Sequence, residues 1–111
     1  MHIYHLKTCD TCKKAIKALA DREPSLVDVR ADGVSPDLLK TWLEAVGPEV
    51  LLNRKSTTWR NLSEAERAGD PLTLLQANPT LMKRPVIVDG RDLHVGWSKA
   101  VQEALGTVNS G

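Results

Sequence analysis

The first thirty residues change from the hydrophobic period of a strand to that of a helix and back again. Residues 2–6 form a short β-favouring run. The apolar residues that follow recur at a helical spacing, at Cys12, Ile16 and Leu19, while lysines occupy the opposite side. Glu23-Pro24 interrupts this helix, and residues 26–29 predict a second strand. The pattern therefore predicts a β-α-β start, in which Cys12 faces the core and Cys9 lies where the helix begins.

The rest of the chain is dominated by helix-start and turn signals. Residues 35–37 (Ser-Pro-Asp) predict the start of a second helix, which Gly47-Pro48 ends. Residues 49–82 carry no strand signal, and Ser63 with Glu66 makes a capping box within them. Residues 85–88 and 93–95 flank Asp89-Gly90, which predicts a β-hairpin. Ser98 can cap a last helix, followed by a loose tail over residues 106–111.

This order of elements indicates an α/β fold of the thioredoxin-like type. We expect a mixed sheet with a helical insertion, at about residues 49–82, between the second and third strands. The chain of 111 residues is expected to form a single domain over residues 1–111. At this length, folding buries roughly two thirds of the surface of the open chain, so the core requires neither disulfides nor a metal.

Charge and hydropathy argue against several classes of main partner, although they do not exclude a local basic patch. Lys and Arg number 15 against 14 Asp and Glu, a net charge of +1. This balance does not favour direct contact with nucleic acid or an anionic membrane. No apolar run approaches the roughly 20 residues that span a bilayer, and residues 1–5 do not resemble a secretory signal. We therefore expect a cytoplasmic protein.

Two cysteines, Cys9 and Cys12, form a C-x-x-C motif at the start of the first predicted helix. The unpaired N–H groups and the positive dipole end of a helix N-terminus favour a thiolate over a thiol. Such motifs lower the cysteine pKa from near ~8.5 to about 7 or below. The negative charge of Asp10 opposes this lowering of the pKa. Three neighbouring cations favour it, namely Lys7, Lys13 and Lys14. We expect Cys9 to be the nucleophile and Cys12 the resolving thiol.

Other interpretations of these residues remain open. Cys12 lies on the apolar stripe and can be a small core residue without any chemistry. A zinc site can be assembled from the ligand types present at His2, His5, Cys9 and Cys12, although alternate residues of a strand face opposite sides. His94 lies in a predicted strand and is expected to be packed or exposed rather than a catalytic base. We expect no bound metal.

Four motifs together resemble a known family. They are residues 8–15 (TCDTCKKA), 51–53 (LLN), 57–60 (TTWR) and 83–87 (KRPVI). With them, the chain resembles the arsenate reductase, Spx and YffB family, closest to its YffB-like branch. The resemblance extends from His2 to about Leu105. It implies a thioredoxin-like fold, Cys9 as the reactive thiol, and Arg84 as an active-site arginine preceding a cis-proline at Pro85.

The resemblance also guides the choice of substrate-binding candidates. We take Thr8, Lys13, Arg54, Arg60 and Pro85 as this set. Residues 57–60 are consistent with a partner or peptide groove, although Trp59 can equally be packed beneath the insertion. Arg84 can, alternatively, be a charged residue entering a strand.

Arsenate reductases of this family use three arginines around the cysteine, and this chain departs from that pattern. Only Arg84 has a clear counterpart, because Asn53 follows Leu51-Leu52, with Arg54 one step away, and residues 95–97 contain no arginine. A compact dianion requires several fixed cationic donors. Arsenate reduction is therefore the third of three functions considered.

The first function is a thiol–disulfide reductase that acts on a small thiol or protein disulfide. It is expected to hold no bound cofactor and to use glutathione or another thiol as co-substrate. The second is an Spx-like redox sensor. Spx-like members use the same C-x-x-C as a redox switch and bind RNA polymerase, which would then be the partner.

Overall fold

The computed structural model describes residues 1–106, which form two compact units along the chain. The first consists of Met1–Asp28 together with the described residues from Arg84 onward, and the second is Val29–Lys83. The loose tail expected after Gly106 lies outside the described residues.

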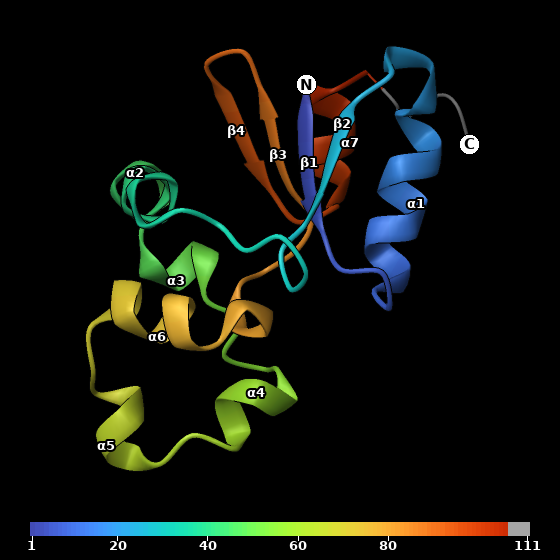
Figure 1. Ribbon diagram of the computed structural model, residues 1–111. Helices are drawn as coiled ribbons and strands as arrows, with labels where there is room; N and C mark the ends of the chain where they lie inside the picture. Colours follow the sequence, from blue (N-terminus) through green and yellow to red (C-terminus); the bar gives the residue numbers. More distant parts are fainter. Residues whose placement is uncertain (107–111) are drawn as a thin grey trace. The chain divides into compact units, whose positions relative to one another are not determined.

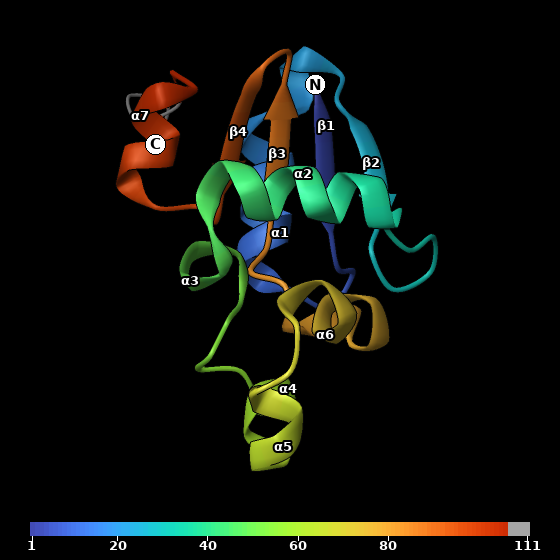
Figure 2. The ribbon, with the colours of Figure 1, turned by 90° about the vertical axis from the view of Figure 1, so that its left-hand side faces the viewer.

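A four-stranded mixed sheet forms the centre of the first unit (Figure 1). Its strands are β1 (His2–His5), β2 (Ser25–Asp28), β3 (Val86–Asp89) and β4 (Asp92–Val95). The strand order is β2-β1-β3-β4, in which β2 runs parallel to β1 while β3 and β4 are antiparallel to their neighbours. In Figure 2 the four strands lie side by side in this order. The expected mixed α/β sheet of thioredoxin-like type is confirmed.

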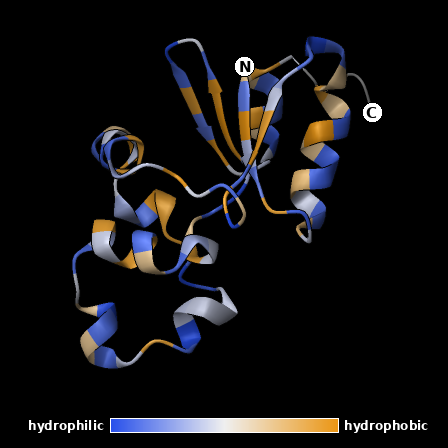
Figure 3. Cartoon of the chain, viewed as in Figure 1, coloured by the Kyte–Doolittle hydropathy of each residue, from blue (hydrophilic) through white to orange (hydrophobic). Residues whose placement is uncertain are grey.

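Two helices, α1 (Asp10–Ala18) and α7 (Lys99–Ala104), accompany this sheet: α1 buries Cys12 and Ala15, whereas Val101 of α7 is partly buried against the core. Ile3 of β1 and its cross-strand partner Ile87 of β3 form a buried cluster with Leu19 and Leu105, which follow the two helices. Polar and apolar positions alternate around α1, as the hydropathy colouring in Figure 3 shows. The helix therefore presents one apolar side to the core, as its period predicts.

Turns connect these elements in conformations set by particular residues. Gly90, in the β3–β4 turn, has a φ of 60°, which a residue without a Cβ adopts without strain. The peptide bond between Arg84 and Pro85 is cis, as the family resemblance implied. The Gly96 N–H donates a hydrogen bond to the Pro85 carbonyl at 2.8 Å, which ties the end of β4 to the start of β3.

The second unit contains the helical segments between β2 and β3. They are α2 (Pro36–Val46), α3 (Pro48–Leu51), α4 (Thr57–Arg60), α5 (Glu64–Arg67), α6 (Pro71–Ala77) and the 3-10 turn η2 (Pro79–Leu81). Leu39 and Trp42 of α2 are buried, as are Leu75 of α6 and Leu81 of η2. Helical segments between the second and third strands were expected, and they are confirmed.

The structure differs from the sequence prediction at the end of the first helix, at the strand ends and at one contact between distant residues. The first helix ends at Ala18 and continues as a 3-10 turn, η1 (Ala20–Arg22), which Glu23 ends with a φ of 49°. The expected strand boundaries differ from those of the structure by at most one residue, as the variability of element ends allows. Residues 49–82 include one isolated antiparallel bridge, Leu52 to Met82, where no strand signal was found.

Candidate functional site

Cys9 is the residue that caps the N-terminus of α1. Its backbone is extended, with φ −89° and ψ 113°, and its Sγ accepts a hydrogen bond from the Cys12 N–H at 3.4 Å. The Cys9 N–H donates to the Leu6 carbonyl at 3.0 Å, and the Cys9 carbonyl accepts from the Lys13 N–H at 3.1 Å. The sulfur therefore occupies the capping position that Ser, Thr or Asp fills at other helices.

Cys12 lies one turn further along α1 and faces the core. It is 0% exposed, whereas Cys9 is half-buried, and both are free thiols. Ala15, on the same side of the helix, is also fully buried. The predicted inward orientation of Cys12 is confirmed, and so is the position of Cys9 at the start of the helix.

The surroundings of Cys9 lower its pKa below the ordinary value of 9.0. Burial raises the pKa, but hydrogen bonds from the Cys12 thiol and the Cys12 backbone N–H outweigh it, together with the charge of Arg84 and the Thr11 backbone. The direction agrees with the sequence prediction. The cation responsible is Arg84, whereas the prediction named Lys7, Lys13 and Lys14.

The same contacts act on Cys12 in the opposite sense. Burial raises the pKa of the Cys12 thiol to about 12, and donation of its proton to Cys9 and the negative charge of Cys9 raise it as well. The Leu6 backbone and the Arg84 charge lower it, without reversing the result. Of the two thiols, Cys9 is therefore the one that loses its proton at the lower pH, and Cys12 keeps its proton at neutral pH.

Arg84 belongs to the same unit as the two cysteines and immediately precedes β3. Its side chain is half-buried, and its Nε atom is buried. Because its charge lowers the pKa of both thiols, the guanidinium lies close enough to act on each of them. Arg84 is therefore part of the cysteine site rather than only a charged residue entering a strand.

Three more of the predicted site residues lie in this unit. Thr8 is exposed directly before Cys9, Lys13 is exposed on the first full turn of α1, and Pro85 is buried after Arg84. All three are next to Cys9 or Arg84 in sequence or one helical turn away. Their role in substrate binding remains a prediction.

The other two candidates, Arg54 and Arg60, belong to the Val29–Lys83 unit and are exposed. The Arg54 guanidinium lies over the ring of Trp59, 5.5 Å from its centroid. Arg67, which the sequence analysis did not single out, lies 5.6 Å from the same ring and donates to the carbonyls of Trp59 and Arg60 at 3.1 Å each. Trp59 is half-buried, so part of its side chain packs against the protein and the rest faces solvent.

Comparison with known proteins places this site in a family. The model of the ArsC family matches residues 4–105. The chain belongs to the ArsC family.

Individual relatives agree with this assignment. An uncharacterized protein of Haemophilus influenzae is 42% identical over 109 residues, which cover 92% of this chain and 95% of that one. The solved structure of a YffB protein is 33% identical, with a TM-score of 0.84 and coverage of 93% and 96%. The global transcriptional regulator Spx of Bacillus subtilis is more distant, at 26% identity over 87% of this chain and 79% of that one. The resemblance predicted from the motifs is confirmed.

The zinc alternative has no geometric support in this ArsC-family protein. Within residues 1–106, no group of three or more His, Cys, Asp or Glu side chains is arranged to hold a metal ion. His94 is half-buried in β4 and pairs with Ile87 of β3. Among the same residues, no helix is long and apolar enough to cross a bilayer.

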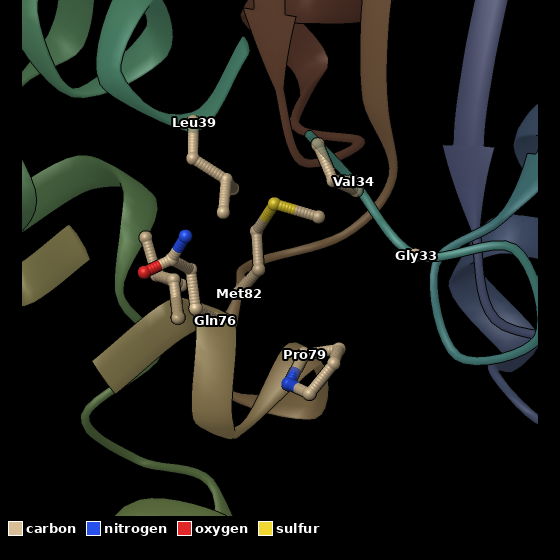
Figure 4. Close-up of a pocket in the computed structure, with 7 residues that line it drawn as sticks. Gly33, Val34, Leu39, Gln76, Pro79 and Met82 are labelled. Carbon is tan, nitrogen blue, oxygen red and sulfur yellow. The ribbon is translucent and has the colours of Figure 1, made fainter. Parts of the chain in front are cut away.

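A pocket of about 220 Å³ lies in the second unit (Figure 4). It is lined mainly by apolar side chains, from Val34, Leu39, Leu75, Pro79 and Met82, with Gly33 and Gln76. None of these residues can ionise or act as a nucleophile. The pocket therefore adds no catalytic group to those of the cysteine site.

Proposed function

We propose that this protein is a cytoplasmic thiol–disulfide reductase in which Cys9 is the nucleophile and Cys12 the resolving thiol. The observation that carries the proposal is the asymmetry of the pair. The half-buried Cys9 sulfur accepts hydrogen bonds from Cys12, while Cys12 is fully buried and retains its proton. One sulfur is thereby available for attack, and the second is held beside it.

The first step is attack by the Cys9 thiolate on one sulfur of a substrate disulfide. A bond forms between Cys9 and that sulfur, the substrate S–S bond breaks, and the other half leaves as a thiolate that takes a proton from water. This step removes the negative charge from Cys9.

The second step follows from that loss of charge. Two of the influences that raise the pKa of Cys12 are its hydrogen bond to Cys9 and the Cys9 charge, and both end when the mixed disulfide forms. The Leu6 backbone and Arg84 still lower the pKa. Cys12 then loses its proton more readily, attacks Cys9 and releases the bound half as a thiol, which leaves a Cys9–Cys12 disulfide.

A co-substrate thiol closes the cycle. Two molecules of a thiol such as glutathione reduce the internal disulfide and leave as one oxidised disulfide, so the cycle needs no bound cofactor or metal. Arg84 contributes a positive charge beside the sulfur atoms, which favours the thiolate in each exchange. It can also hold a carboxylate of the substrate in a bidentate pair.

Turnover of a glutathione mixed disulfide tests this proposal. The chain is incubated with a peptide–glutathione disulfide, reduced glutathione and an enzymatic recycling system, and the rate is compared with that of free cysteine at equal thiol concentration. The proposal predicts a clearly faster rate that is lost in Cys9→Ser. A rate no greater than that of free cysteine refutes it.

The similarity to Spx favours a second candidate function, a redox sensor that binds transcription machinery. The same cysteine pair would then be a switch rather than a catalyst. Pull-down of RNA polymerase from a lysate under oxidising and reducing conditions distinguishes the two. A partner that binds in only one redox state supports the sensor, and binding that does not depend on redox state excludes it.

Arsenate reduction remains the third candidate. Arg84 is the one arginine with a counterpart in the expected trio, and Arg54 lies over Trp59 in the other unit. A direct assay with arsenate, glutathione and glutaredoxin tests it, and we expect no activity above the protein-free background.

A further inference from the structure

The exposed charges around Cys9 are mostly positive. In the loop before α1 and along the helix, the exposed cations are Lys7, Lys13, Lys14 and Lys17. The exposed anion of this segment is Asp10, which directly follows Cys9. A charged substrate that approaches the Cys9 sulfur therefore meets a local field that the net charge of the whole chain, +1, does not reveal.

From this arrangement we infer that Lys13 selects disulfides that carry negative charge near their sulfur atoms, and that Asp10 opposes this selection. The inference rests on the proposed reductase function and specifies its substrate class: anionic disulfides, with carboxylates a few bonds from the sulfur. Lys13 acts as a specificity residue that receives the substrate and takes no part in the exchange of bonds.

The position of Lys13 follows from the backbone. Its N–H donates to the Cys9 carbonyl at 3.1 Å, so it lies one turn beyond Cys9 on the same face of α1. Helical side chains lean toward the N-terminus, and that of Lys13 is exposed. The Lys13 side chain therefore begins one helical turn from Cys9 on the exposed surface of α1, within reach of the remote groups of a substrate bound at Cys9.

Lys17, the next lysine on this face of α1, lies farther from Cys9 than Lys13 does. At about 1.5 Å per residue, Lys13 is roughly 6 Å along the helix axis from Cys9, and Lys17 is roughly 12 Å away. The Debye length at 0.1 M ionic strength is about 10 Å. Lys17 is therefore a matched control, with the same charge on the same helix but beyond the range of effective attraction.

The reaction that reports on this selection is the first exchange alone. The Cys9 thiolate forms a bond with one sulfur of the reagent, the reagent's S–S bond breaks, and the other half leaves as a thiolate. The rate of loss of reduced protein is measured with oxidised glutathione (net negative), cystamine (net positive) and bis(2-hydroxyethyl) disulfide (uncharged).

The uncharged reagent corrects for any change in Cys9 itself. A substitution that alters the thiolate population changes all three rates by the same factor, whereas attraction changes the rates of the anionic and cationic reagents in opposite directions. The measured quantity is the ratio of the oxidised glutathione rate to the cystamine rate, and the uncharged rate, followed separately, shows whether a substitution has changed Cys9 itself. Comparing this ratio between variants cancels the intrinsic reactivity of the reagents.

At an ionic strength of about 0.1 M, Lys13→Gln is expected to lower this ratio by roughly two- to fourfold. Asp10→Asn is expected to raise it by a similar factor, and Lys17→Gln to leave it unchanged. Added salt should bring the variants together. The inference is overturned if Lys13→Gln keeps the wild-type ratio, if Asp10→Asn fails to raise it, or if Lys17→Gln lowers it as much as Lys13→Gln.

Failure of this inference and failure of the reductase function give different results. A wild-type protein with normal turnover and equal ratios in all variants loses only the role of Lys13. A protein whose ratio depends on Lys13 but whose turnover does not exceed that of free cysteine loses the reductase function and keeps a charge-selective thiol.

Discussion

Replacing Cys12 with alanine tests whether the buried thiol stabilises the Cys9 thiolate. The substitution removes the S–H that donates to Cys9 and leaves the Cys12 backbone N–H, which donates to the same sulfur at 3.4 Å. Cys12 is 0% exposed, so water does not readily replace the lost donor. The pKa of Cys9 should therefore rise.

The size of the effect follows from the energy of one hydrogen bond to a charged group. Such bonds contribute about 1.5–3 kcal/mol, and the lower end applies because Cys9 itself is half-buried. About 1.4 kcal/mol corresponds to a tenfold change in thiolate population at a pH below the pKa. A more basic thiolate is also more nucleophilic, with a Brønsted coefficient of about 0.4–0.5, which offsets nearly half of this change on a logarithmic scale. The net loss of rate is therefore roughly fourfold.

Alkylation with iodoacetamide across a range of pH, followed by intact mass, measures this effect. At acidic to neutral pH, Cys12→Ala should react roughly fourfold more slowly than the wild type, and at alkaline pH it should react as fast or faster. Cys12→Ser keeps a hydroxyl donor and should lie between the two. Identical pH profiles for Cys12→Ala and the wild type would show that the buried thiol does not stabilise Cys9.

Three further predictions concern the same site. Cys9→Ser should not react with thiol reagents at neutral pH. After incubation with oxidised glutathione, Cys12→Ser should accumulate a mixed disulfide, whereas the wild type should close an internal bridge about two mass units below the reduced form. Equal labelling of both variants would contradict this prediction. Arg84→Lys keeps the charge but loses the bidentate geometry, so turnover should fall while the urea midpoint stays nearly constant; unchanged turnover would exclude a role for the guanidinium. Between pH 9 and about 12, the free energy of unfolding should fall as pH rises, because unfolded Cys12 loses its proton while folded Cys12 keeps it; urea titrations should show a shallower fall in Cys12→Ala.

Elements that depend on adjacent residues could be predicted from the sequence. Ser35 accepts from the Leu38 N–H at 3.2 Å, and Ser63 and Glu66 form both hydrogen bonds of the predicted capping box. Ser98 caps α7 by accepting from Val101. Each of these caps involves side chains and N–H groups within one helical turn, so the order of residues alone determines which groups can meet.

Contacts between distant parts of the chain could not be predicted in this way. The bridge between Leu52 and Met82 joins two ends of the helical segment, and neither end has a strand pattern. The guanidinium of Arg22 donates to the Leu105 carbonyl, which links η1 to the end of α7. Stacking of Arg54 and Arg67 on Trp59 depends on how two short helices and a loop fold back on one another. The hydrophobic periodicity of a sequence predicts local elements, not contacts between residues that are far apart in the chain.

The cysteine site combines both kinds of information. The position of Cys9 at a helix N-terminus and the inward orientation of Cys12 are local properties, and both were predicted correctly. The charge that lowers the pKa of both thiols is not local: it is that of Arg84, which lies just before β3 and is separated from Cys9 in sequence by the whole second unit. Arg84 lies two residues before β3, and β3 pairs with β1, the strand that precedes Cys9 in the chain. Formation of the β1–β3 pair therefore brings Arg84 and Cys9 to the same end of the sheet. The reactivity of Cys9 therefore depends on formation of the sheet, and variants that weaken the β1–β3 pairing should alter the Cys9 pKa without changing any residue of the site.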